Sequence, residues 1–296
     1  MVWRYFVQYI RELKKYYWPK NAEDAVRMMI QEPDSQVIAG GTDLLVSGPP
    51  RKQVKNLIDI TKCGLSYIKK DKKSIKIGST TTMSEIQHNP ALMDYANGIL
   101  SKAAARFVSV QIRNVATIGG NLASSWPSSD LAPALMALDA KILAIGKEKK
   151  EFAIDSFFIS RRQSALGALE LITEIEIPQI PSKSGFSFVK FGRTEVDIAL
   201  VNGAAMIELS DDKKVATIRL AMGSVAPTTV RCVEVEKELK GKNLTKEIIA
   251  AACENVSKSI DPKSDVRASA KYRGRLARVL AARLIEEAFL NAGGKF

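Results

Sequence analysis

Two Gly-Gly steps are the feature that most constrains this chain. The first lies in AGGTD at residues 39–43, directly after a short apolar run, and the second lies in TIGGN at residues 117–121. Glycine has no Cβ and adopts positive φ readily, so a Gly-Gly step lets backbone N–H groups converge on a ligand. Successive N–H groups of this kind form a nest that suits a phosphate oxygen. Together the two segments could hold one diphosphate from two sides.

Each glycine pair alone has a simpler explanation, because Gly-Gly after a strand is most often a tight turn. Two such segments in one chain make that explanation weaker. Neither segment matches the dinucleotide fingerprint G-x-G-x-x-G or the phosphate loop that ends in Gly-Lys-Ser/Thr. Any cofactor site formed by these two segments is therefore of another kind.

The same residues carry a family resemblance. AGGTDLL at residues 39–45, taken with TIGGNLA at 117–123, resembles the FAD-binding medium subunit of the molybdenum hydroxylases. That family includes the medium chain of carbon monoxide dehydrogenase, the flavin portion of xanthine dehydrogenase and related aldehyde oxidoreductases. The resemblance runs from about Tyr17 to about Arg283. It implies an α+β fold, with a two-lobed FAD-binding domain of the vanillyl-alcohol-oxidase (PCMH) type and a C-terminal domain of antiparallel sheet plus helices.

The resemblance also implies a set of FAD-binding residues. From the two glycine segments these are Ala39, Gly40, Gly41, Thr42, Asp43, Leu44, Thr117, Gly119, Gly120 and Asn121. In the family an acidic residue at the position of Asp130 contacts the cofactor, whereas the sequence alone favours a plain helix N-cap there. Lys190 or Arg193 would lie near the flavin ring or its phosphates; without the resemblance both would be ordinary strand-edge charges. Ile198 stands where the carbon monoxide enzyme has a tyrosine near the ring.

The chain divides into an N-terminal extension at 1–13, an FAD-binding domain at 14–180 with lobes at about 14–62 and 63–180, and a C-terminal domain at 186–296. The extension fits either an interfacial amphipathic helix or a segment that packs or frays. The linker is residues 178–185, with two prolines and a polar run. Hydrophobic patterns predict strands at 37–39, 56–60, 67–70, 74–78, 141–145, 169–177, 186–192, 198–209 and 215–222.

Helices are predicted after residue 21, with Asn21 as N-cap, from 82, over 90–105, over 131–138 behind a cap at Ser129 or Asp130, and over 229–239, 245–260 and 269–290. In the last of these, Tyr272, Leu276, Val279, Leu280 and Leu284 recur at helical spacing and are expected to face the core.

Composition excludes several classes of protein. Of 296 residues 46% are hydrophobic and 26% charged, as in soluble globular proteins. No apolar run is long enough to cross a bilayer, and no signal peptide is evident, so we expect a cytoplasmic protein with no transmembrane segment. Three scattered cysteines and the single His88 predict no metal site. The net charge of +12 raises the question of nucleic acid, but the basic residues are spread along the chain. A Lys-rich solvated surface, together with a face that meets acidic partner subunits, explains them better.

The resemblance predicts an electron-transfer subunit. FAD would lie between the two lobes and the C-terminal domain, take electrons from an iron–sulfur small subunit and pass them to an external acceptor. A molybdopterin large subunit would complete a heterotrimer, possibly dimerised, and select the substrate. No catalytic residue is expected in this chain. The alternatives are a self-contained flavin oxidase of the vanillyl-alcohol oxidase type, which often attaches FAD through a histidine, and a scaffold that has lost its cofactor. His88 lies in neither glycine segment, and the intact glycine pairs argue against a lost cofactor.

Overall fold

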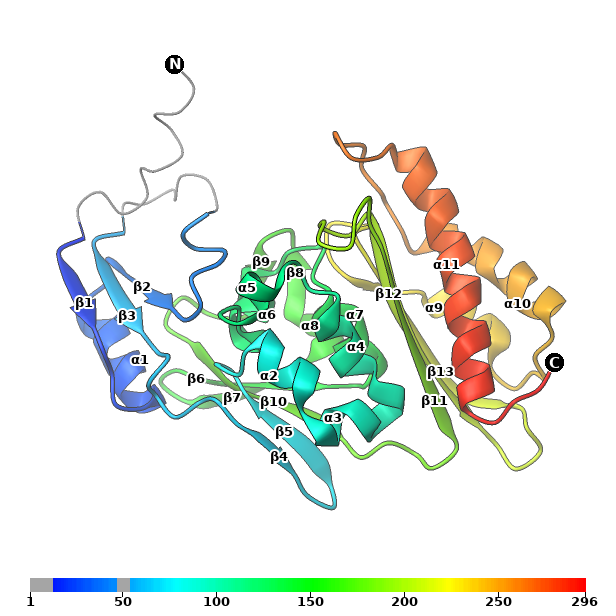
Figure 1. Ribbon diagram of the computed structural model, residues 1–296, viewed down its shortest axis with the longest axis horizontal. Helices are drawn as coiled ribbons and strands as arrows, with labels where there is room; N and C mark the ends of the chain where they lie inside the picture. The colour runs from blue at the N-terminus through cyan, green and yellow to red at the C-terminus, as the bar shows by residue number, and fades with distance from the viewer. Residues whose placement is uncertain (1–12, 47–53) are drawn as a thin grey trace.

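The computed structural model describes residues 13–46 and 54–296 (Figure 1). The predicted N-terminal extension, apart from Leu13, lies outside the described residues. The first lobe is a parallel sheet in the order β1-β3-β2, covered by one helix. Its elements are β1 (Lys15–Tyr17), α1 (Ala22–Gln31), β2 (Ser35–Ile38) and β3 (Asn56–Asp59). Asn21 caps α1, as predicted, because its side chain accepts a hydrogen bond from the N–H of Asp24.

The second lobe contains a five-stranded antiparallel sheet in the order β4-β5-β10-β6-β7. Its strands are β4 (Ile68–Lys70), β5 (Ser74–Gly78), β6 (Lys141–Ile145), β7 (Lys149–Ala153) and β10 (Leu171–Pro178). Short helices lie beside this sheet (Figure 1): α2 (Met83–His88), α3 (Pro90–Asp94), η2 (Tyr95–Gly98), α4 (Ile99–Ala105), α5 (Val110–Arg113), α6 (Ile118–Ser124), α7 (Leu131–Ala137) and α8 (Ile154–Phe157). A small hairpin, β8 (Phe158–Ser160) with β9 (Gln163–Ser164), follows α8. The strand patterns predicted β4, β5, β6 and β10, but β7, β8 and β9 were missed.

The single helix predicted over 90–105 is wrong. The chain breaks in the middle, where Ala96 has φ +53° and Asn97 has φ +56°. The Asn97 side chain accepts a hydrogen bond from the N–H of Phe186 at 2.9 Å, which ties the break to the C-terminal sheet. The dipeptide Asn97-Gly98 is itself a turn signal, and Gly98 also has a positive φ of +69°, so the break has a local cause as well as this tertiary contact.

The C-terminal part is a four-stranded antiparallel sheet in the order β11-β12-β13-β14. Its elements are β11 (Ser184–Phe191), β12 (Val201–Leu209), β13 (Val215–Gly223), β14 (Val230–Arg231), α9 (Val233–Leu239), α10 (Lys246–Cys253), η3 (Glu254–Lys258) and α11 (Ala270–Asn291). The helix predicted over 229–239 starts later, because its first residues form β14. The helix predicted over 245–260 ends as a 3₁₀ turn.

The core-facing stripe predicted for α11 is partly wrong. Leu280 and Leu284 are buried, but Tyr272 is 46% exposed and Val279 is 44% exposed. The buried face also carries Ala277, Ala281 and Ala288. These small residues let α11 lie close on the sheet (Figure 1): a Cβ added at Gly185 would be 2.1 Å from the carbonyl oxygen of Ala288.

The C-terminal sheet is buried on both faces. One face packs on α9, α10 and α11 around a core that includes Val201, Leu220 and Leu284. The other face packs on α4 and α7, and Phe186, Met206 and Ala221 belong to the same hydrophobic core as the second lobe. The first lobe is built around a smaller core, to which the second lobe adds Leu65 and Leu171. The second lobe and the C-terminal sheet are therefore joined by continuous apolar packing. Within the described ranges, no helix is long and apolar enough to span a membrane.

Candidate cofactor site

The two glycine segments lie against each other, as the diphosphate hypothesis requires. The first glycine loop (residues 39–46) follows β2, and Gly41 within it has φ +68°. A Cβ added at Gly40 would be 1.8 Å from the carbonyl oxygen of Val115, two residues before the second segment, and 3.1 Å from Cα of Ala116. Gly40 is therefore needed first for close backbone packing between the two lobes, whatever else it binds.

The first glycine loop offers unused donors. Among the hydrogen bonds of the described residues, none is donated by the backbone N–H of Gly40, Gly41 or Thr42. The turn is closed further along, where the N–H of Leu45 donates to the oxygen of Gly41 at 2.9 Å. Ala39, Gly40, Gly41, Thr42, Asp43 and Leu44 are all half-buried. Backbone N–H groups in a partly exposed loop, without an acceptor among the described residues, have the chemistry that an anionic phosphate needs.

The second glycine segment is not a nest, and that expectation was wrong. It forms the first turn of α6, with Thr117 as N-cap, and its N–H groups bond within the protein. Gly119 donates to the oxygen of Ser79 at 2.8 Å and Gly120 to Oγ1 of Thr117 at 3.2 Å. Asn121 donates to the oxygen of Thr117 at 3.0 Å. The second glycine segment can therefore form a wall of the site, but its N–H groups are not available as donors to a phosphate.

Gly119 and Gly120 have different roles in that shape. A Cβ at Gly119 would lie 2.6 Å from Cβ of Ser79, so this glycine serves internal packing. Gly120 is exposed, and among the described residues a Cβ there would meet only Oγ1 of Thr117 within 4 Å. The backbone at Gly120 is thus open to a ligand. Asn121 is half-buried, and its Oδ1 accepts a hydrogen bond from the Ser129 hydroxyl at 2.6 Å.

The carboxylate of Asp43 is held by the second lobe. Its Oδ1 accepts a hydrogen bond from the indole Nε1 of Trp126 at 2.7 Å, and its Oδ2 lies 3.1 Å from Nη2 of Arg162. The Arg162 guanidinium also lies over the Trp126 ring, 4.7 Å from the centroid. Sequence reasoning missed Trp126 and Arg162, because no local pattern links them to Asp43.

Asp130 and Lys190 form a buried ion pair between the second lobe and the C-terminal sheet. Lys190 Nζ lies 2.6 Å from Oδ2 of Asp130, and the two side chains are 1% and 4% exposed. Nζ also donates to the carbonyl oxygen of Arg106 at 2.8 Å. Nδ2 of Asn202 donates to Oδ1 of Asp130 at 2.9 Å. Burial raises the pKa of Asp130, and the neighbouring Lys190 opposes this rise.

This ion pair settles two open alternatives. Lys190 is not a strand-edge charge, and Asp130 does not cap α7 with its side chain. The cap is Ser129, whose Oγ accepts from the N–H of Ala132 at 3.2 Å. Asn202 is a further partner that the sequence did not indicate.

Ile198 lies in the connection between β11 and β12 and is 52% exposed. Val196 in the same connection is 53% exposed. Arg193 is paired locally, with Nε 3.0 Å from Oδ2 of Asp197. The connection between β11 and β12 therefore exposes two apolar side chains, and the charge of Arg193 beside them is paired with Asp197.

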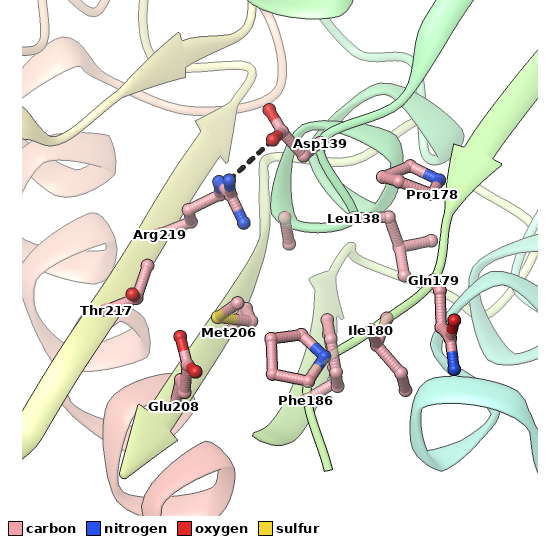
Figure 2. Close-up of a pocket in the computed structure, with 12 residues that line it drawn as sticks. Leu138, Asp139, Pro178, Gln179, Ile180, Phe186, Met206, Glu208, Thr217 and Arg219 are labelled. Atoms are coloured by element: carbon pink, nitrogen blue, oxygen red, sulfur yellow. Dashed lines mark hydrogen bonds and ion pairs between the residues drawn. The ribbon is translucent and has the colours of Figure 1, made fainter. Parts of the chain in front are cut away.

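A pocket between the second lobe and the C-terminal sheet is separate from these residues (Figure 2). Leu138, Ile180, Phe186 and Met206 are among its lining residues, and the ion pair between Asp139 and Arg219, 2.6 Å apart, stands at its side. No residue predicted for FAD lines it. The described part of the chain holds no cluster of His, Cys, Asp or Glu suited to a metal ion.

The first glycine loop and Gly120 fit an FAD diphosphate in two respects. The loop supplies uncommitted N–H donors, and Gly120 leaves room for close approach. In such a site backbone N–H groups, and not charged side chains, bind the phosphate.

Comparison with known proteins assigns the class. Residues 10–180 match the FAD binding domain in molybdopterin dehydrogenase, and residues 186–288 match the C-terminal domain of carbon monoxide dehydrogenase flavoprotein. The chain belongs to this family of FAD-binding domains of molybdopterin dehydrogenases.

Individual relatives cover nearly the whole chain. It is 31% identical to the 6-hydroxypseudooxynicotine dehydrogenase complex subunit alpha of Paenarthrobacter nicotinovorans, over 92% of this chain and 93% of that protein. It is 29% identical to the carbon monoxide dehydrogenase medium chain of Hydrogenophaga pseudoflava, over 93% and 96%. A chain in a solved structure of that organism's carbon monoxide dehydrogenase, lacking the Mo-pyranopterin moiety, superposes with a TM-score of 0.89 at 28% identity, covering 95% of this chain and 98% of that one.

These matches confirm the predicted family, the α+β fold, the FAD cofactor and the oxidoreductase class. They also favour the FAD subunit of a molybdenum hydroxylase over the self-contained flavin oxidase.

Proposed function

We propose that the chain binds one FAD non-covalently and transfers electrons within a molybdenum hydroxylase complex. The observations that support the binding site are the three N–H groups at Gly40, Gly41 and Thr42, which have no acceptor among the described residues, and the open backbone of Gly120. The diphosphate would lie there. The isoalloxazine ring supplies the redox chemistry, so the protein needs no acid, base or nucleophile of its own.

The other predicted residues have distinct roles in this proposal. Ala39 and Leu44 flank the donors of the first glycine loop, and Thr117, Gly119 and Asn121 shape the opposite wall. Ile198, which is half exposed and apolar, would lie near the flavin ring. Asp130 and Lys190 bind each other. They would support the site by fixing the domain joint instead of contacting the cofactor.

The partners in this proposal are an iron–sulfur small subunit and a molybdopterin large subunit in a heterotrimer. Support comes from relatives that are named as a complex subunit and as a medium chain. The net charge of +12 favours acidic partner surfaces, and association should then weaken with salt. The chain would work in the cytoplasm, with an external acceptor receiving the electrons.

The binding site can be tested with one glycine and a matched control. Gly120→Val adds a branched side chain where the diphosphate should approach, so the variant should lose FAD while keeping its circular dichroism spectrum. Gly274→Val is the control, because a Cβ at Gly274 in α11 would meet no atom of the described residues within 4 Å apart from the neighbouring backbone of its own helix. Acid precipitation should release free FAD from the wild type and the control. Full FAD content in Gly120→Val, or flavin that stays with the precipitate, would contradict the proposal.

The electron-transfer role is tested by anaerobic mixing. The FAD-loaded chain alone should not be bleached by aldehydes, purines or carbon monoxide, and bleaching should appear when the two partner subunits are added. Rapid bleaching by such a substrate without partners would favour the self-contained oxidase instead.

A further inference from the structure

The first glycine loop contains a carboxylate in an unexpected place. Asp43 directly follows the three free N–H groups proposed to receive a diphosphate. An unpaired carboxylate there would repel the phosphate oxygens, because like charges at short range raise the free energy of binding. The loop can bind an anion well only if the charge of Asp43 is neutralised and its carboxylate points away from the N–H groups.

Arg162 supplies that neutralisation from a distant part of the chain. Its Nη2 lies 3.1 Å from Oδ2 of Asp43, while Trp126 donates its indole N–H to Oδ1 of the same carboxylate at 2.7 Å. The ion pair is partly exposed, with side chains 41% and 34% accessible. Trp126 and Arg162 bind different oxygens of the carboxylate, so they orient it as well as pair its charge.

Arg162 is itself held rigidly in the turn between β8 and β9. Its backbone N–H donates to the oxygen of Ser125 at 3.0 Å, at the C-terminal end of α6. Ser125 and Arg162 both have left-handed backbones, with φ +48° and +62°. Figure 1 shows the β8–β9 hairpin beside α6, the helix whose first turn carries Gly120. The turn therefore links Asp43 to the same helix that forms the opposite wall of the proposed site.

We propose that Arg162 is a positioning residue for FAD binding. It acts through Asp43: it pairs with the carboxylate, turns it away from the free N–H groups and so leaves the first glycine loop able to receive the diphosphate. Arg162 does not itself contact the cofactor. The inference rests on the proposed function, since it assumes that FAD binds at this loop.

A double-mutant cycle distinguishes this role from direct contact. The FAD dissociation constant would be measured on apoprotein by flavin fluorescence for wild type, Arg162→Gln, Asp43→Asn and the double variant. Arg162→Gln should bind about fivefold more weakly at low salt, as expected for loss of a partly exposed pair. The difference should shrink at high salt. Asp43→Asn should bind at least as tightly as wild type, and the double variant should match Asp43→Asn. A double variant as weak as Arg162→Gln would show direct action on FAD and overturn the proposal.

Arg161 provides the matched control. It is the preceding residue, it lies 5.2 Å over the same Trp126 ring, and it makes no ion pair with any described residue. Arg161→Gln removes the same charge but not the Asp43 pair, so its affinity should stay within twofold of wild type. If Arg161→Gln and Arg162→Gln lose the same affinity for FAD, the effect comes from the loss of positive charge alone, and the proposal is overturned.

Two further outcomes separate the possible failures. Arg162→Lys keeps the charge, so it should retain most of the affinity for FAD. It replaces Arg162→Gln if that variant fails to fold. If a folded Arg162→Lys binds FAD fivefold more weakly and adding Asp43→Asn does not restore the affinity, the proposal is overturned. Equal affinity of wild type and Arg162→Gln would overturn this inference alone. A wild-type chain that binds no FAD would instead overturn the proposed function on which it rests.

Discussion

Replacement of Lys190 with methionine should strongly destabilise the fold. The substitution keeps the length of the side chain but leaves the Asp130 carboxylate buried without its cation. Asp130 would retain the Asn202 amide as a donor, and the carbonyl oxygen of Arg106 would lose the Nζ contact. Breaking a buried pair on one side costs about 3–5 kcal/mol, which for a chain of this size lowers the melting temperature by about 6–20 °C.

The loss should depend on pH in a defined direction. Burial raises the pKa of Asp130, and Lys190 is the largest influence that opposes the rise. Without Lys190 the folded-state pKa rises further above the unfolded value of about 3.9. A group with a raised folded-state pKa favours the folded state at low pH and loses that contribution as pH rises through the folded pKa. The destabilisation should therefore be larger at pH 8 than at pH 5.

The assay is thermal unfolding of apoprotein at both pH values. Lys141→Met is the control, because Lys141 is also a strand lysine in an ion pair, 2.8 Å from Glu151, but both side chains are about half exposed. It should change stability by less than about 1 kcal/mol. Asp130→Asn combined with Lys190→Met should recover part of the loss. If Lys190→Met is no less stable than Lys141→Met, the pair does not stabilise the domain joint and the reasoning is refuted.

Three further predictions concern individual positions. Gly40→Ala should lower the melting temperature even without FAD, because its Cβ would overlap the carbonyl oxygen of Val115; an unchanged melting curve would contradict this. Ser224→Gly should raise the free energy of unfolding by about 1 kcal/mol in urea titration, since Ser224 has φ +64° and a buried hydroxyl without a hydrogen-bond partner among the described residues. Burial raises the pKa of Cys63 to about 11 and that of Cys232 to about 12. At pH 8 neither thiol should react with Ellman's reagent until the chain unfolds, and rapid labelling of the native protein would disprove this.

Local signals in the sequence predicted much of the fold. The cap at Asn21, the hairpin of β4 and β5 and the three long C-terminal strands all depend on residues close together in the chain. The proximity of the two glycine segments was predicted from their shared chemistry. That they touch through Gly40 and Val115 required the structure.

Most of what the sequence missed involves contact across long sequence separations. In the second glycine segment the N–H groups of Ile118 and Gly119 donate to the carbonyl oxygens of Thr81 and Ser79, which its own residues do not reveal, while Gly120 and Asn121 donate to Thr117 within the segment. The buried ion pair of Lys190 was not predicted either, because its partner Asp130 lies sixty residues away in the sequence. The break in the helix over 90–105 is also tied to Phe186, almost ninety residues further on. None of these distant partners can be identified from local pattern.

Because the second lobe and the C-terminal sheet pack on each other continuously, we expect that they cannot be expressed as two separate soluble proteins. A cut between β10 and β11 would separate the two sequences at their predicted linker, yet each fragment would expose the residues that it contributes to one shared core. The upstream product would leave the apolar faces of α4 and α7 uncovered, and the downstream product would display Phe186, Met206 and Ala221 to water. Such faces drive aggregation. Each half expressed alone should form inclusion bodies, whereas co-expression of both should give a nicked protein that purifies as one species.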